Sequence, residues 1–116
     1  IGVAASIVPI AKAKTLIAVA GTATSVAADF LNLEEYDRYA IHLTHVPTES
    51  VHATSKKFGA MTSAERAGVG FLHPGRSDVF AAGSLVLSEI MKATGAKEYV
   101  ASESDILDGM AWSLVS

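Results

Sequence analysis

The chain has 116 residues, of which 50% are hydrophobic and 18% are charged, and its formal net charge is -3. This size and composition predict a single globular domain over residues 1–116. The weakly acidic balance offers no basic excess for nucleic acid or for an anionic membrane surface. The absence of cysteine excludes disulfides, thiolate metal sites and a cysteine nucleophile.

The opening residues are apolar, but they do not read as a signal peptide. They lack an initiating Met and a leading positive region, and Pro9 interrupts the apolar run. No stretch approaches the length of about 20 apolar residues that spans a bilayer. Because the chain begins at Ile1 in the middle of a pattern, we expect it to be a piece of a longer protein.

The first third of the chain predicts a helix, a strand and a second helix. Apolar spacing favours a helix over residues 1–14. The continuous β-branched run Thr15–Ala20 predicts a strand buried on both faces. Helical spacing resumes over Thr24–Leu33, where Thr22 or Thr24 would cap the first amides.

The middle of the chain is more polar and predicts mainly helices. Weak alternation over Ala40–Val46 predicts a short strand, stopped by the proline that follows. A helix is expected over residues 47–61. Thr62 and Glu65 have the spacing of a capping box at the start of another short helix.

The last third predicts a long helix, a strand and a closing helix. The long helix covers residues 73–95 and ends at Gly95 as a left-handed cap. Its expected apolar stripe is Val79, Gly83, Val86 and Ile90, with Phe80, Leu87 and Met91 beside it. The letters KEYVAS predict a strand, and Ser102 or Ser104 would open the closing helix. Strands that alternate with helices predict an α/β fold with parallel pairing, but two core strands need further partner strands.

The turn AGTATS (Ala20–Ser25) is the first candidate site. A strand that ends at Gly21 and is followed by hydroxyl residues presents unpaired amides and the positive end of a helix dipole, and anions bind such ends. The glycine fingerprints GxGxxG and GxxxxGK[ST] are absent. The pattern alone therefore favours an ordinary capped turn over an anion site.

Charged residues at two helix starts are the other candidates. Arg76 lies at the end of a helix that disfavours a cation, so it needs a carboxylate or an anion as partner, and a nearby Asp or Glu is the favoured one. Glu103, Asp105 and Asp108 fit the acidic first turn of a helix better than a metal site. The four histidines have no spacing that predicts a metal site.

Five segments together resemble the C-terminal portion of the exopolyphosphatase / guanosine pentaphosphate phosphatase (Ppx/GppA) family, of its short actinobacterial type. They are LIAVAGTATSVAA, LEEYD, AMTSAERAGV, HPGRSDVFAAGSLVLSEIM and SESDILDGMAWSL, in this order. The resemblance implies the C-terminal half of a ribonuclease-H-like lobe of the actin-like ATPase fold, with a helical insert over Tyr36–Val69. It also implies a cytoplasmic hydrolase of terminal phosphoanhydride bonds.

Residue by residue, the resemblance transfers little of the catalytic machinery. Three catalytic features of the family have no counterpart here, because they precede this region: the catalytic Glu, the first Asp-containing phosphate loop and the second, glycine-rich loop. Mg²⁺ would be bound mainly by that preceding, N-terminal part. The resemblance does imply that Gly21, Thr22 and Ser25 face the phosphate cleft, with Arg76 near them. Ser102 and Glu103 fall in a segment where relatives carry more glycine. The resemblance makes these two residues further candidates for the cleft.

The expected substrate is inorganic polyphosphate or guanosine pentaphosphate, and the chain alone is expected to be inactive. Its expected partners are its own N-terminal lobe or, without that lobe, a second copy of the chain, because an open sheet edge favours self-association. A second reading is a sensor that binds polyphosphate or an alarmone without hydrolysis. A third is an actin-like or sugar-kinase-like relative that uses ATP.

Overall fold

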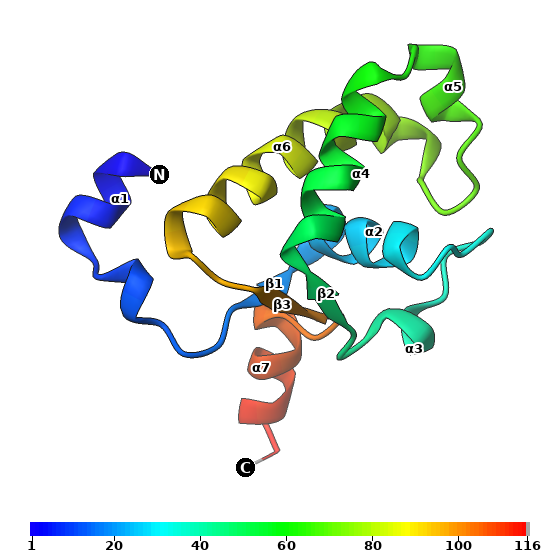
Figure 1. Ribbon diagram of the computed structural model, residues 1–116. Helices are drawn as coiled ribbons and strands as arrows, with labels where there is room; N and C mark the ends of the chain where they lie inside the picture. The colour runs from blue at the N-terminus through cyan, green and yellow to red at the C-terminus, as the bar shows by residue number, and fades with distance from the viewer. Residues whose placement is uncertain (116) are drawn as a thin grey trace.

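A small mixed sheet with helices packed on one side organises the chain (Figure 1). The computed structural model describes residues 1–115, without the side chain of Pro74. Its elements in chain order are α1 (Gly2–Ile7), a 3-10 turn (Ile10–Lys12), β1 (Ile17–Val19), α2 (Ala20–Phe30), α3 (Arg38–Ile41), β2 (His45–Pro47), α4 (Thr48–Ala60), α5 (Ser63–Ala67), a 3-10 turn (Pro74–Arg76), α6 (Ser77–Thr94), β3 (Glu98–Ser102) and α7 (Ile106–Ser113).

The sheet has the order β1-β3-β2, with β1 parallel and β2 antiparallel to the central strand β3. The predicted α/β class with parallel pairing is therefore confirmed. Helices α2, α4 and α6 cover one face and enclose the core (Figure 1). Within it the buried Tyr99 hydroxyl donates a hydrogen bond to the Ala23 carbonyl at 2.6 Å, and burial raises the pKa of this phenol.

The prediction that the first strand is buried on both faces is wrong. Ile17 and Val19 are 61% and 48% exposed. In the register, Ile17 lies opposite Val100 and Val19 opposite Ser102, so these side chains share the sheet face that α2, α4 and α6 do not cover. Ile17 and Val19 therefore lack a second layer over this face within residues 1–115, whereas Ala18 packs against the core.

Two of the predicted elements near the N-terminal end are shorter or shifted. The expected helix over residues 1–14 breaks at Val8, which is extended (φ -117°, ψ 133°) because it precedes Pro9. The helix expected from Thr24 begins instead at Ala20, directly after β1, and no side chain caps it. Thr24 lies inside α2, where its hydroxyl donates to the carbonyls of Ala20 and Gly21 at 3.2 and 3.3 Å.

The polar middle follows the prediction except for its strand. Within residues 40–46, only the last residues are extended. The first residues belong to the short helix α3, which Asp37 starts by accepting hydrogen bonds from the amides of Tyr39 and Ala40. Helix α4 forms as expected. The capping box of α5 is also confirmed: the Thr62 amide donates to Glu65 Oε1 at 3.0 Å, and the Glu65 amide donates to Thr62 Oγ1 at 3.2 Å.

Helix α6 ends at Gly95 with φ +67° as predicted but begins at Ser77 instead of residue 73. Of its expected apolar residues, those placed beside the stripe (Phe80, Leu87 and Met91) are buried, whereas the stripe itself is wrong. Val79 and Val86 are 67% and 53% exposed. The buried stripe runs through Phe80, Ser84, Leu87, Ser88 and Met91. Its two serines hide this stripe from a search for apolar periodicity, although their small size suits the close packing of α6 on α4.

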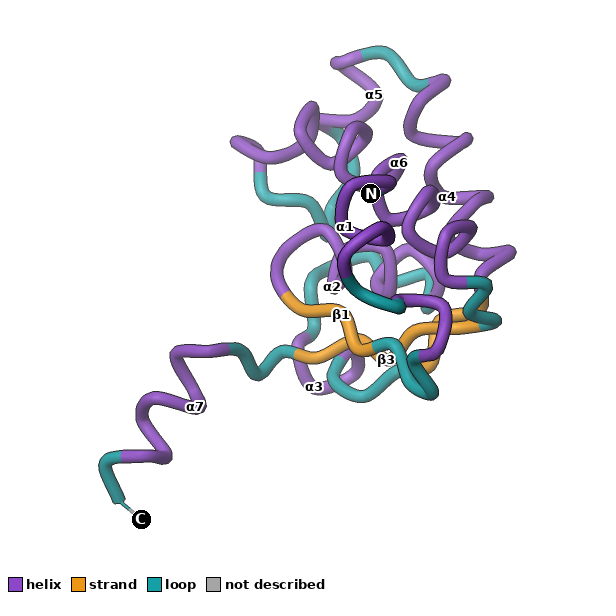
Figure 2. Tube along the Cα trace, turned by 90° about the vertical axis from the view of Figure 1, so that its left-hand side faces the viewer, coloured by secondary structure: helices purple, strands orange, loops and turns teal. Residues whose placement is uncertain are grey.

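The closing helix α7 leaves the body of the protein (Figure 2). Its cap is Asp105, not Ser102 or Ser104: the Asp105 carboxylate accepts from the Leu107 amide at 2.9 Å, and Asp108 accepts from the Asp105 amide at 2.8 Å. No residue of α7 is buried. The carboxylates at 105 and 108 therefore start a helix, as the sequence favours.

Candidate functional site

A pocket of about 1100 Å³ lies at the carboxyl end of β1, the position at which α/β sheets commonly bind ligands. Three stretches far apart in sequence form its wall: the start of α2, the loop after α2, and the segment that leads into α6. The lining residues are Val19, Ala20, Gly21, Thr22, Thr24, Ser25, Tyr36, Gly70, Phe71, Leu72, His73, Arg76, Val79 and Phe80.

The start of α2 gives this pocket a set of free backbone amides. The chain passes from β1 into α2 without a loop, and Ala20 takes a φ of +72°, a conformation that non-glycine residues seldom adopt. The N-cap residue, Val19, forms no side-chain hydrogen bond with the first amides. The first turn of an uncapped helix carries partial positive charge and attracts anions.

Arg76 adds a full positive charge at the same place. A side chain at Gly21 would bring its Cβ to 2.6 Å from Arg76 Nη1, so the guanidinium lies directly over the Gly21 backbone. The guanidinium forms no ion pair or hydrogen bond with any other residue that the structure describes. The favoured prediction that a nearby Asp or Glu pairs with Arg76 is therefore wrong.

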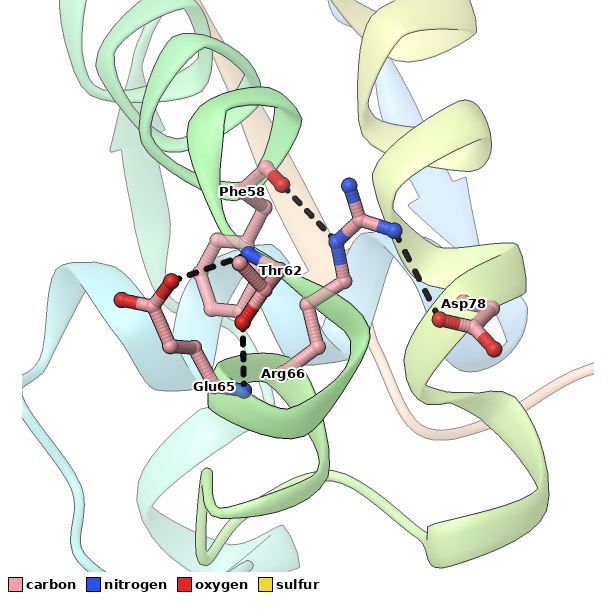
Figure 3. Close-up of polar contacts among 5 residues, drawn as sticks. All are labelled: Phe58, Thr62, Glu65, Arg66 and Asp78. Carbon is pink, nitrogen blue, oxygen red and sulfur yellow. Dashed lines mark hydrogen bonds and ion pairs between the residues drawn. The ribbon is translucent and has the colours of Figure 1, made fainter.

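The nearest sequence candidate for that pairing, Asp78, is bound by a different arginine (Figure 3). Arg66 Nη1 lies 3.5 Å from Asp78 Oδ1, and Arg66 Nε donates to the Phe58 carbonyl at 3.0 Å. Arg66 thus fastens the start of α6 to the end of α4. Since Asp78 is oriented toward Arg66, it leaves Arg76 available to the pocket.

The structure brings four of the predicted site residues to this one pocket: Gly21, Thr22, Ser25 and Arg76 all line it. Thr22 and Ser25 are half-buried, and each contributes a hydroxyl-bearing side chain to the pocket lining. Hydroxyl groups, together with an arginine and backbone amides, are hydrogen-bond donors that suit the oxygens of a phosphate group.

Ser102 and Glu103 do not line the pocket. Ser102 Oγ donates to the Ser104 carbonyl at 2.8 Å, a local turn contact. Glu103 Oε1 accepts a hydrogen bond from the hydroxyl of Tyr36, which does line the pocket. Sequence reasoning missed Tyr36 as a site residue, because a single aromatic residue in a polar loop has no periodicity or spacing to mark it.

The carboxylates and histidines of residues 1–115 form no group of three or more that could hold a metal ion. His42 accepts from the Glu103 amide, His45 pairs with Glu98, and His52 contacts Ser88. In the same part of the chain, no helix is both long and apolar enough to cross a membrane.

Comparison with known proteins finds exopolyphosphatases among the relatives of this chain. Exopolyphosphatase 2 of Mycobacterium tuberculosis is 37% identical over 111 residues, which cover 92% of this chain and 35% of that protein. A crystal structure described as an exopolyphosphatase-like protein is 34% identical, with a TM-score of 0.84 over 92% of this chain and 36% of the other. No protein-family model matches the sequence.

A further structure extends the likeness of fold. The Ppx/GppA family member of Aquifex aeolicus superimposes with a TM-score of 0.84 over 92% of this chain and 37% of the other, at 20% identity. The chain thus spans about a third of the length of the relatives that it matches.

The mixed sheet, its helical layer and the likeness to these structures define an α/β protein of the actin-like ATPase fold. The chain belongs to the exopolyphosphatase and Ppx/GppA family, and it matches the C-terminal portion of the family's members.

Proposed function

We propose that this chain forms the phosphate-facing wall of a cytoplasmic exopolyphosphatase, an enzyme that removes the terminal phosphate from inorganic polyphosphate or the 5′-phosphate from guanosine pentaphosphate. One observation carries the proposal: the Arg76 guanidinium, unpaired within residues 1–115, lies over Gly21 at the uncapped start of α2. The 37% identity to an exopolyphosphatase supports the choice of substrate.

In this proposal the chain binds and orients the phosphate chain but does not activate water. The amides of the first turn of α2 and the hydroxyls of Thr22 and Ser25 bind phosphate oxygens, and Arg76 balances their charge. The catalytic carboxylate and most of the Mg²⁺ ligands belong to the part of the family's chain that precedes this region. A bound Mg²⁺ would stabilise charge on the transferred phosphoryl group.

The proposed division of the enzyme into a preceding N-terminal lobe and this chain also predicts what covers the exposed apolar residues. Ile17 and Val19 on β1, and Leu107 and Met110 on α7, are all between 48% and 69% exposed. The family's N-terminal lobe covers them in the whole enzyme. Without that lobe, the chain relieves the exposure by self-association.

The division is tested by assaying phosphate release from polyphosphate by the purified 116-residue chain with added Mg²⁺. We expect no phosphate release above a heat-denatured control, because in this proposal the general base belongs to the preceding part of the protein and not to this chain. Phosphate release that scales with the concentration of the chain would contradict the proposal. The preceding sequence of the parent gene separates an enzyme from a binding sensor: an intact catalytic Glu and both glycine-rich loops support the enzyme.

A further inference from the structure

Tyr36 links the pocket to a carboxylate that stands outside it. The residue lies in the loop between α2 and α3, is 44% exposed and forms part of the pocket wall. Its hydroxyl donates a hydrogen bond to Glu103 Oε1, just beyond the carboxyl end of β3. Glu103 itself is not part of the wall. The phenol therefore joins the pocket wall to a carboxylate that is not part of that wall.

Further hydrogen bonds hold the backbone on the Glu103 side of this contact. The Glu103 amide donates to His42 Nδ1 at 3.0 Å, which holds the residue after β3 against the segment after α3. The Leu43 amide donates to the Ala101 carbonyl at 2.8 Å, and the Ala101 amide donates to the Thr44 carbonyl at 2.9 Å. With the backbone of Glu103 held in this way, the Tyr36 hydroxyl determines where its carboxylate points.

The electrostatics of the pocket make that orientation matter. Its cation, Arg76, has no carboxylate partner within residues 1–115, and its helix start is uncapped. A carboxylate that turned toward this region would attract the guanidinium and repel a bound anion. Burial, followed by the hydrogen bond to Glu103, raises the pKa of the Tyr36 phenol, so it remains a donor to the carboxylate at neutral pH.

We propose that Tyr36 is a positioning residue that holds the Glu103 carboxylate away from the pocket and so preserves its affinity for phosphate groups. The inference rests on the proposed function, because it assumes that the pocket binds an anion. It goes beyond that function in assigning Tyr36 and Glu103 a joint role that is electrostatic rather than a direct contact with the ligand.

The test is a titration of four forms of the chain with tripolyphosphate, followed by amide shifts in NMR spectra. Tyr36→Phe keeps the ring and removes only the hydroxyl, and we expect it to weaken binding about fivefold, the effect of one partly exposed charge. Glu103→Gln should bind at least as tightly as the wild type. The double variant Tyr36→Phe/Glu103→Gln should regain wild-type affinity, because the repelling charge is gone.

The following outcomes overturn the inference. Equal weakening in Tyr36→Phe and in the double variant means that the hydroxyl acts without Glu103, and unchanged affinity in Tyr36→Phe means that the hydroxyl is not needed. If the wild type shows no saturable binding, the proposed function fails and the positioning role fails with it. Wild-type binding without rescue in the double variant overturns the positioning role alone.

A titration of tyrosinate absorbance gives a readout without any ligand. Arg38 and the Thr24 hydroxyl lower the pKa of the Tyr36 phenol, whereas burial and Glu103 raise it. We expect Glu103→Gln to shift the Tyr36 titration, isolated as the difference from Tyr36→Phe, to lower pH. An unshifted titration shows that the contact is absent in solution and overturns the inference.

Discussion

At the scale of single residues, a close approach between α2 and α6 places Thr22 at the pocket. A Cβ added to Gly83 would lie 2.4 Å from Thr22 Oγ1 and 3.3 Å from Thr22 Cβ. The second contact involves an atom that cannot rotate away, so the two helices would have to separate. Glycine at 83 is thus part of the geometry of the site, although it does not line the pocket.

We expect Gly83→Ala to lower the free energy of unfolding by about 1 kcal/mol. Overpacking costs about 1–3 kcal/mol and is offset by about 1 kcal/mol of improved helix propensity. Urea denaturation measures the difference. In the Thr22→Ala background the same change should be less costly, because the closest atom is then absent.

The matched control is Gly59→Ala on α4, where an added Cβ meets no atom within 4 Å. This variant should be stabilised by about 0.5–1 kcal/mol, since alanine loses less backbone entropy in a helix. If Gly83→Ala proved as stabilising as Gly59→Ala, the close approach of Thr22 to α6 would be refuted.

At the scale of elements, the sequence predicted one helix start and one helix end correctly, whereas the starts of α2 and α7 and the buried face of α6 differ from the prediction. The capping box of Thr62 and Glu65 and the left-handed cap at Gly95 formed as expected, because each depends on residues within one turn. The buried face of α6 depends on α4 instead, where Phe80 packs edge-on against Phe58 with ring centroids 4.7 Å apart. Such a partner is invisible in a local pattern.

The candidate site shows the same limit. The turn that contains Gly21 could be found from the strand before it and the hydroxyls after it. The lack of an ion pair at Arg76 could not be predicted in this way. Arg66, on α5, pairs with Asp78, and this contact depends on how α5 packs against α6. Tyr36 could not be found either, because the fold brings the loop after α2 to the pocket wall.

Helix α7 carries the element-scale prediction on assembly. At about tens of micromolar, where weak interfaces form, sedimentation velocity should show self-association of the chain. Leu107→Lys/Met110→Lys adds charge to two residues that are 69% and 59% exposed, and it should shift the chain toward monomer. Tyr39→Lys, at a residue 88% exposed on α3, is the control and should leave the association unchanged. A clean monomer for the wild type would contradict the prediction.

At the scale of the whole molecule, the fold assembles one pocket from segments that are far apart in the chain. The β1–α2 junction supplies the amides, the loop after α2 supplies Tyr36, and the segment before α6 supplies Arg76. On β1 the chain exposes Ile17 and Val19, and Val19 also lines the pocket. This arrangement supports the proposal that the chain is one part of an enzyme. The chain contributes binding groups to a site, and other parts of the protein pack against its exposed apolar residues.

The central claim is that the Gly21–Arg76 region binds a phosphate chain, and a titration of ¹⁵N-labelled chain with tripolyphosphate tests it most directly. We predict saturable shifts at the amides of Gly21 and Ser25, and about tenfold weaker binding in Arg76→Ala, the effect of one hydrogen-bonded charge. Lys92→Ala removes an exposed charge at the far end of α6 and should bind as the wild type does. Equal weakening by both variants, or no saturable shift in the wild type, would contradict the claim.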